Sequence, residues 1–111
     1  MTTVSGRVLL TPDLGSFPRA VLRVRVLDVT LADAPSRELA VTVQDLTYDG
    51  KGTLAVPFRL SADWAPGRSV VVDAHLDRSG SGVVESGDAL TVRSTPVPDE
   101  PVPVTVRLRA V

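Results

Sequence analysis

Residues 20–34, which read AVLRVRVLDVTLADA, constrain the fold of this chain more than any other segment. In the first half of this segment, Leu22, Val24 and Val26 fall on one side of an extended chain and arginines fall on the other. This period of two is typical of a half-buried β-strand. The second half breaks the alternation with an acidic turn that ends at Pro35. The segment therefore predicts a strand followed by a turn.

Further segments of the chain alternate in the same way, and Gly, Pro and Asp form turns between them. In one of these segments we expect Leu39, Val41 and Val43 to face the core. Short strands at this spacing predict an all-β fold, namely a two-layer antiparallel β-sandwich of about seven strands in a single domain over residues 1–111. The expected strands lie near residues 4–10, 20–29, 39–43, 54–60, 70–76, 89–93 and 102–108.

Glycine and proline add detail to three of these strands. Gly6 predicts a bulge or a close backbone approach in the first strand. Pro57 lacks an N–H group, which predicts an edge position or a bulge for the fourth strand and protects that strand from pairing with another chain. The first and the seventh strands are therefore the edges that we expect to be free. Residues 95–101 are rich in proline and predict a rigid crossing between sheets.

Composition excludes several classes of protein. Hydrophobic residues make up 43% of the chain and aromatic residues only 4%, so the core must be aliphatic. A net charge of -1 argues against nucleic acid and anionic membrane surfaces as partners. The absence of cysteine excludes disulfides and thiolate sites. No apolar run approaches the ~20 residues of a membrane helix, and Met1–Gly6 lacks the pattern of a signal peptide. These features predict a soluble, cytoplasmic protein without membrane insertion, unless a leader has been removed.

The segment from Asp77 to Asp88 has the spacing of a Ca²⁺-binding loop. A glycine stands at position six, and oxygen-bearing side chains stand at positions one, three, five, nine and twelve, as in an EF-hand loop. Serine at positions three and five carries no charge, and the flanking segments are strands. The alternative interpretation is a Gly/Ser hairpin with no bound ion. The candidate metal ligands are Asp77, Ser79, Ser81, Glu85 and Asp88.

Other candidate sites are weaker. His75 is the single histidine and shares one face of its strand with Asp73 and Asp77, a row that could hold a divalent ion or form a pH-sensitive charge pair. No Gly-x-Ser-x-Gly motif and no phosphate-binding loop is present, which argues against an enzyme. Outward arginines at 23, 25, 107 and 109 would form a basic strip if their strands adjoin. Trp64 and Tyr48 offer either a small contact patch or caps for the core.

Several motifs of this chain resemble the YbaY/YscW family of small bacterial lipoproteins. The resemblance runs from Gly6 to about Val97, and its most specific blocks are Asp28-Val29, Ala32-Asp33-Ala34 and Val56-Pro57-Phe58. It implies a β-sandwich without catalytic residues. Some members of this family act as pilotins or chaperones that assist secretin subunits.

The sequence thus predicts a non-enzymatic protein-interaction or chaperone-like module with no cofactor. Its expected partner is another protein, bound through an edge strand, because unpaired backbone groups at a sheet edge can add a partner's strand. The alternative is a Ca²⁺-binding β domain that uses the loop 77–88.

Overall fold

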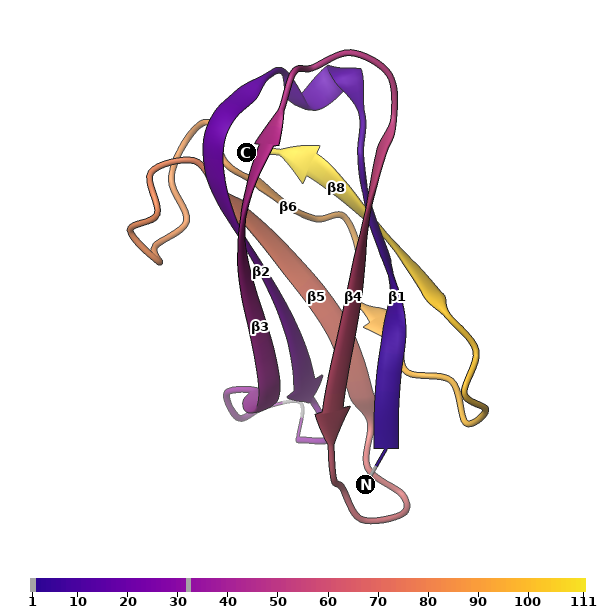
Figure 1. Cartoon of the computed structure of the whole chain (residues 1–111). Coiled ribbons are helices and arrows are strands. Elements are labelled where there is room, and N and C mark those ends of the chain that lie inside the picture. The colour runs from indigo at the N-terminus through magenta and orange to yellow at the C-terminus, as the bar shows by residue number, and fades with distance from the viewer. Residues whose placement is uncertain (1, 32) are drawn as a thin grey trace.

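A computed structural model describes residues 2–31 and 33–111, so the turn motif around Ala32 lies partly outside the described residues. Strands dominate the described part of the chain, which confirms the all-β prediction (Figure 1). A short 3-10 helix, η1 (Pro12–Leu14), connects the first two strands. No helix in these ranges has the length and apolar character needed to cross a membrane. The strands are β1 (Thr2–Leu10), β2 (Phe17–Asp28), β3 (Arg37–Tyr48), β4 (Leu54–Ala62), β5 (Val70–Asp77), β6 (Ala89–Thr91), β7 (Thr95–Pro96) and β8 (Val104–Ala110).

The strands form one continuous hydrogen-bonded path in the order β3-β2-β5-β6-β8-β1-β4, with β7 added to β5. The predicted sandwich of two antiparallel layers is therefore not confirmed in its details. One pair is parallel, because β8 runs alongside β1 from the pair Gly6/Val104 to the pair Leu9/Arg107. The proline-rich crossing before β8 contains β7 and returns the chain in the same direction as β1. Alternation predicts which face of a strand is buried, and strand direction is decided by these distant connections.

An aliphatic core fills the space between the strands, as the composition predicts. In β2, Leu22, Val24 and Val26 are fully buried, and the arginines between them point outward. β-Branched and leucine side chains pack well on such pleated surfaces. The other large side chains that are apolar and fully buried come from every long strand except β3 and β4; they are Val8, Leu10, Phe17, Val72, Leu76 and Val106.

Gly6 allows β1 and β8 to approach each other closely. A Cβ atom at this position would lie 1.9 Å from the carbonyl oxygen of Val104, so no larger residue fits without movement of the backbone. The prediction of a close backbone approach is confirmed.

Strand β3 packs Leu39 against the core as predicted, but beyond this residue it presents the opposite face from the one that we predicted. Its register with β2 shifts between Val26/Ala40 and Leu27/Glu38, which leaves Leu39 as an extra residue in a β-bulge. Beyond the bulge every side chain changes face, since the side-chain period of a strand is two. The prediction that Val41 and Val43 face the core is therefore wrong: they are 43% and 59% exposed.

The edges of the sheet are β3 and β4. The prediction that the first and seventh strands have free edges is wrong, because β1 lies between β8 and β4, and β8 pairs with β6 and β1. Pro57 does lie in an edge strand, β4, as predicted. Figure 1 shows β3 and β4 at the front of the molecule, connected by the turn over residues 49–53.

Candidate functional site

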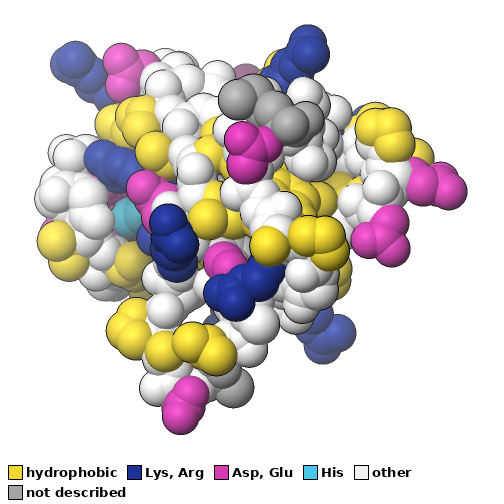
Figure 2. Space-filling model, turned by 90° about the horizontal axis from the view of Figure 1, so that it is seen from below, with side chains coloured by type: hydrophobic (Ala, Val, Ile, Leu, Met, Phe, Trp, Pro, Cys, Tyr) yellow, Lys and Arg dark blue, Asp and Glu magenta, His cyan; other side chains and the backbone are white. Residues whose placement is uncertain are grey.

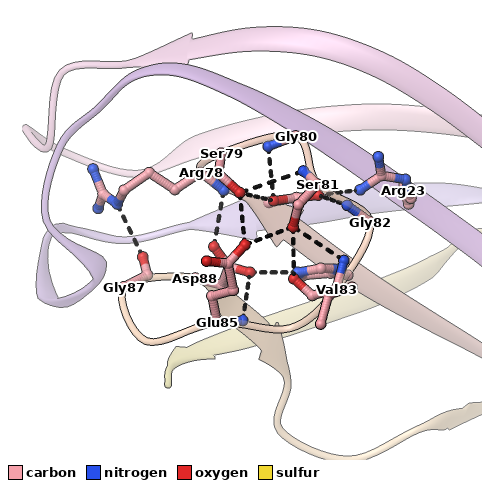
Figure 3. Close-up of polar contacts among 12 residues, drawn as sticks. Arg23, Arg78, Ser79, Gly80, Ser81, Gly82, Val83, Glu85, Gly87 and Asp88 are labelled. Atoms are coloured by element: carbon pink, nitrogen blue, oxygen red, sulfur yellow. Dashed lines mark hydrogen bonds and ion pairs between the residues drawn. The ribbon is translucent and has the colours of Figure 1, made fainter.

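The predicted metal-ligating residues come together in the loop that connects β5 to β6. Three glycines with positive φ, at positions 80, 82 and 87, bend the loop back on itself. The side chains of Ser79 and Ser81 both donate hydrogen bonds to Glu85 Oε1, at 2.8 and 2.6 Å. Figure 3 shows these groups directed toward one another inside the loop, with Arg23 reaching it from β2.

Asp77 is the centre of this loop and is fully buried. Its Oδ1 accepts a hydrogen bond from the amide of Gly80 at 2.9 Å, and its Oδ2 accepts one from the amide of Gly82 at 2.8 Å. Arg23 forms an ion pair with the same carboxylate. Burial alone raises the pKa of Asp77, but the hydrogen bonds from Gly82, Arg23 and Gly80 outweigh it and lower the pKa to about 2. The carboxylate is therefore ionised under ordinary conditions and acts as an anchor for the loop.

Asp88 closes the loop at its other end and contacts the single histidine. Its Oδ1 accepts from the amide of Arg78 at 2.9 Å, and its Oδ2 lies 2.8 Å from His75 Nε2. Burial raises the pKa of Asp88, and hydrogen bonds from His75, Arg78 and Glu85 lower it further than burial raises it. Within the predicted row of Asp73, His75 and Asp77, His75 contacts Asp88 and Asp73 pairs with Arg25; a function of this row stays a prediction.

His75, Asp77 and Asp88 each place one potential metal-ligand atom within 4.8 Å of the others. In the described residues, however, no buried side-chain oxygen or nitrogen lacks a hydrogen-bond partner. Protein donors already contact both carboxylate oxygens of Asp77 and of Asp88, and Oε1 of Glu85. Ca²⁺ binding by Asp77, Ser79, Ser81, Glu85 and Asp88 stays a prediction, and the loop as observed is a hydrogen-bonded closure of the sheet.

The outward arginines of β2 are neutralised by β5. Arg25 donates two hydrogen bonds to Asp73, at 3.1 and 2.9 Å, and Arg23 pairs with Asp77. A basic strip that joins these arginines to those of β8 is not formed, since β5 and β6 lie between β2 and β8. Opposite charges across neighbouring strands stabilise this part of the sheet and leave it without net charge.

The outer edge of β3 is a feature that sequence reasoning missed. Only one hydrogen bond reaches from β3 to β4 in the described chain, from Gln44 Nε2 to the carbonyl oxygen of Pro57 at 3.5 Å. The middle of β3, residues 40–44, has no charged side chain, although charges normally protect edge strands. That uncharged run is the signal that could have identified the edge.

The two remaining aromatic candidates close opposite ends of the core. Tyr48 is buried, and its hydroxyl donates to the carbonyl oxygen of Gly52, so it is a cap. Trp64 is half-buried at the lower end, beside Leu39 and the ion pair between Asp28 and Arg68. Seen from below, hydrophobic side chains of this end reach the surface among charges of both signs (Figure 2).

Comparison with known proteins confirms the predicted resemblance. The family model described as "Type III secretion system lipoprotein chaperone (YscW)" matches residues 1–100. The structure is similar to that of an alternative pilotin from the type II secretion system of Vibrio cholerae, with a TM-score of 0.66 and 23% identity over 99% of this chain and 96% of the other. No curated protein matches this chain. The predicted cytoplasmic location is wrong, because the matching family is one of secretion lipoproteins.

Proposed function

This chain belongs to the YscW family of type III secretion lipoprotein chaperones, and we propose that it is a non-enzymatic chaperone that binds a segment of another protein along the free edge of β3. The partner that this membership favours is a component of a secretion system.

The observation that carries this proposal is the unpaired outer side of β3. This strand has 12 residues and a backbone ladder on one side only, with β2. Unpaired N–H and C=O groups along an edge can add a strand of another protein. A segment that docks there gains main-chain hydrogen bonds from the edge and apolar contact with the exposed Val41 and Val43.

The opposite edge, β4, is less suited to such pairing. Pro57 lies near the middle of that strand and has no N–H group to donate. Residues 55, 57, 59 and 61 of β4 are exposed, but they include a proline and an arginine, which are residues that natural proteins use to block edges. We therefore assign the binding edge to β3 and expect a partner segment to lie over Val43.

Site-specific photocrosslinking in the native host tests this proposal. A photoreactive phenylalanine analogue replaces Val43 in one variant and Val92 in a control, since Val92 is similarly exposed at 55% but lies outside β3. We expect a crosslinked adduct from position 43 whose partner mass spectrometry identifies as a secretion-system protein. The variant Val43→Lys should abolish capture by a second photoreactive group at Val41, while Val92→Lys should not. Equal adducts from positions 43 and 92, or none from position 43, would overturn the proposal.

A further inference from the structure

A second surface, on the outer face of β4, β1 and β8, carries a row of arginines without partners. Arg7, Arg59, Arg107 and Arg109 are all exposed, and within the described ranges none of them forms an ion pair or donates a hydrogen bond. No acidic residue occupies an outward position of these three strands from residue 3 to 9, 55 to 61 or 105 to 109. This face is thus strongly basic in a chain whose net charge is -1.

The strand register arranges three of these arginines in a diagonal. Arg59 lies on β4 opposite Ser5, Arg7 is the next outward residue of β1, and Arg107 lies on β8 beside Leu9. Each step therefore crosses one strand and advances two residues. Across the antiparallel pair of β4 and β1, such diagonal neighbours are about 7–8 Å apart. We call Arg59, Arg7 and Arg107 the arginine diagonal.

A groove runs beside the arginine diagonal. It has a volume of about 670 Å³, and it is lined by Arg7 and Arg59, by Pro57 and Pro103, and by the backbone at Gly6. The two prolines provide rigid apolar walls, and the arginines provide planar donors that match a carboxylate in a two-pronged geometry. The groove thus combines apolar walls with the two guanidinium groups of Arg7 and Arg59.

We propose that this groove binds an extended acidic segment of a partner protein, with carboxylates at alternate positions. In an extended chain, side chains on the same face are about 6.6 Å apart, which is close to the spacing of the diagonal. A protein segment is favoured over an anionic membrane because the surface is hollow. Its walls also lack an exposed aromatic or large aliphatic side chain that could enter a bilayer. The groove adjoins the outer side of β3, since Gln44 bonds to Pro57, but its arginines come from β1 and β4, so the inference does not rest on the function proposed above.

The test uses a fluorescent peptide in which glutamate alternates with alanine, and anisotropy reports its binding to the full chain. We expect R7Q/R59Q/R107Q to weaken binding by about tenfold, because each exposed charge pair contributes a factor of about two to five. The control R19Q/K51Q/R93Q removes the same charge elsewhere and should change the affinity by less than about twofold. The variant R7K/R59K/R107K keeps the charge and loses the planar donors, so it should bind with intermediate affinity.

Several outcomes would overturn the proposal. One is no binding of the glutamate peptide by the unmodified chain, and another is equal binding of a matched peptide with glutamine in place of glutamate. An equal loss of peptide affinity in R7Q/R59Q/R107Q and in R19Q/K51Q/R93Q would mean that the peptide is attracted by net charge alone. Binding to vesicles that contain phosphatidylglycerol, without binding to the peptide, would assign the face to a membrane. The variant Val43→Lys should leave peptide affinity unchanged, which separates this result from a failure of the β3 proposal.

Discussion

Replacement of Gly6 by alanine tests whether the contact between β1 and β8 is as close as the structure indicates. The new Cβ would lie 1.9 Å from the Val104 oxygen, whereas ordinary contact begins at 3.4 Å, so the strands must separate by about 1.5 Å. Backbone hydrogen bonds do not survive such a stretch, because they weaken beyond about 3.2 Å. We expect the loss of roughly two of them, at about 1 kcal/mol each. Partial exposure of Val104 adds up to about 1 kcal/mol, which brings the total to about 3 kcal/mol.

Urea unfolding, followed by the fluorescence of Trp64 and by circular dichroism, measures the free energy of unfolding. A loss of about 3 kcal/mol corresponds to a decrease in Tm of about 10 °C or more. Gly52→Ala is the matched control, since its Cβ would meet nothing within 4 Å but its φ is 64°. This backbone strain alone should cost about 1 kcal/mol. A loss for Gly6→Ala no greater than that for Gly52→Ala would refute the steric argument.

Three further predictions follow from the charged groups. The pKa of Asp77 is about 2 in the folded state and 3.8 ordinarily, so its carboxylate stabilises the fold above about pH 4 and this contribution is lost as the pH falls toward 2. Urea unfolding at a series of pH values should show that the free energy of unfolding of Asp77→Asn falls less steeply with decreasing pH than that of the unmodified chain. Parallel plots of this free energy against pH would contradict the prediction. Ca²⁺ at millimolar concentration should leave Tm unchanged, because protein donors occupy the loop carboxylates; a rise in Tm that Asp88→Asn abolishes would instead establish the Ca²⁺ loop. Arg25→Gln should cost less than about 1 kcal/mol in thermal unfolding, since its pair with Asp73 is partly solvated; a larger loss would mean that water screens this pair poorly.

Alternation alone was sufficient to locate most strands and the buried apolar residues Leu22, Val24 and Val26 of β2. This works because burial on one face of a strand is a local property that the period of two records. The order of the strands is a different matter. The parallel pairing of β8 with β1 joins residues at opposite ends of the chain, and no local pattern predicts it.

Strand β3 shows how a single residue can reverse a prediction. The bulge at Leu39 depends on how β2 and β3 meet, and neither Leu39 nor Ala40 is distinctive in the sequence. In the loop 77–88, by contrast, the spacing of oxygen-bearing residues did predict which side chains come together. Their hydrogen-bond donors were not predictable, since Arg23 lies 54 residues away from Asp77 and reaches it only through the pairing of β2 with β5.

The parallel pairing of β1 with β8 also determines how the molecule resists a mechanical load. Strand β1 begins at the lower end of the fold and β8 ends at the upper end (Figure 1). A force that pulls these ends apart therefore runs along the two strands and shears them. The hydrogen bonds of a parallel ladder are evenly spaced, so they bear such a force together instead of opening one after another. A chain with no cysteine thus gains, from strand direction alone, a clamp between its two ends.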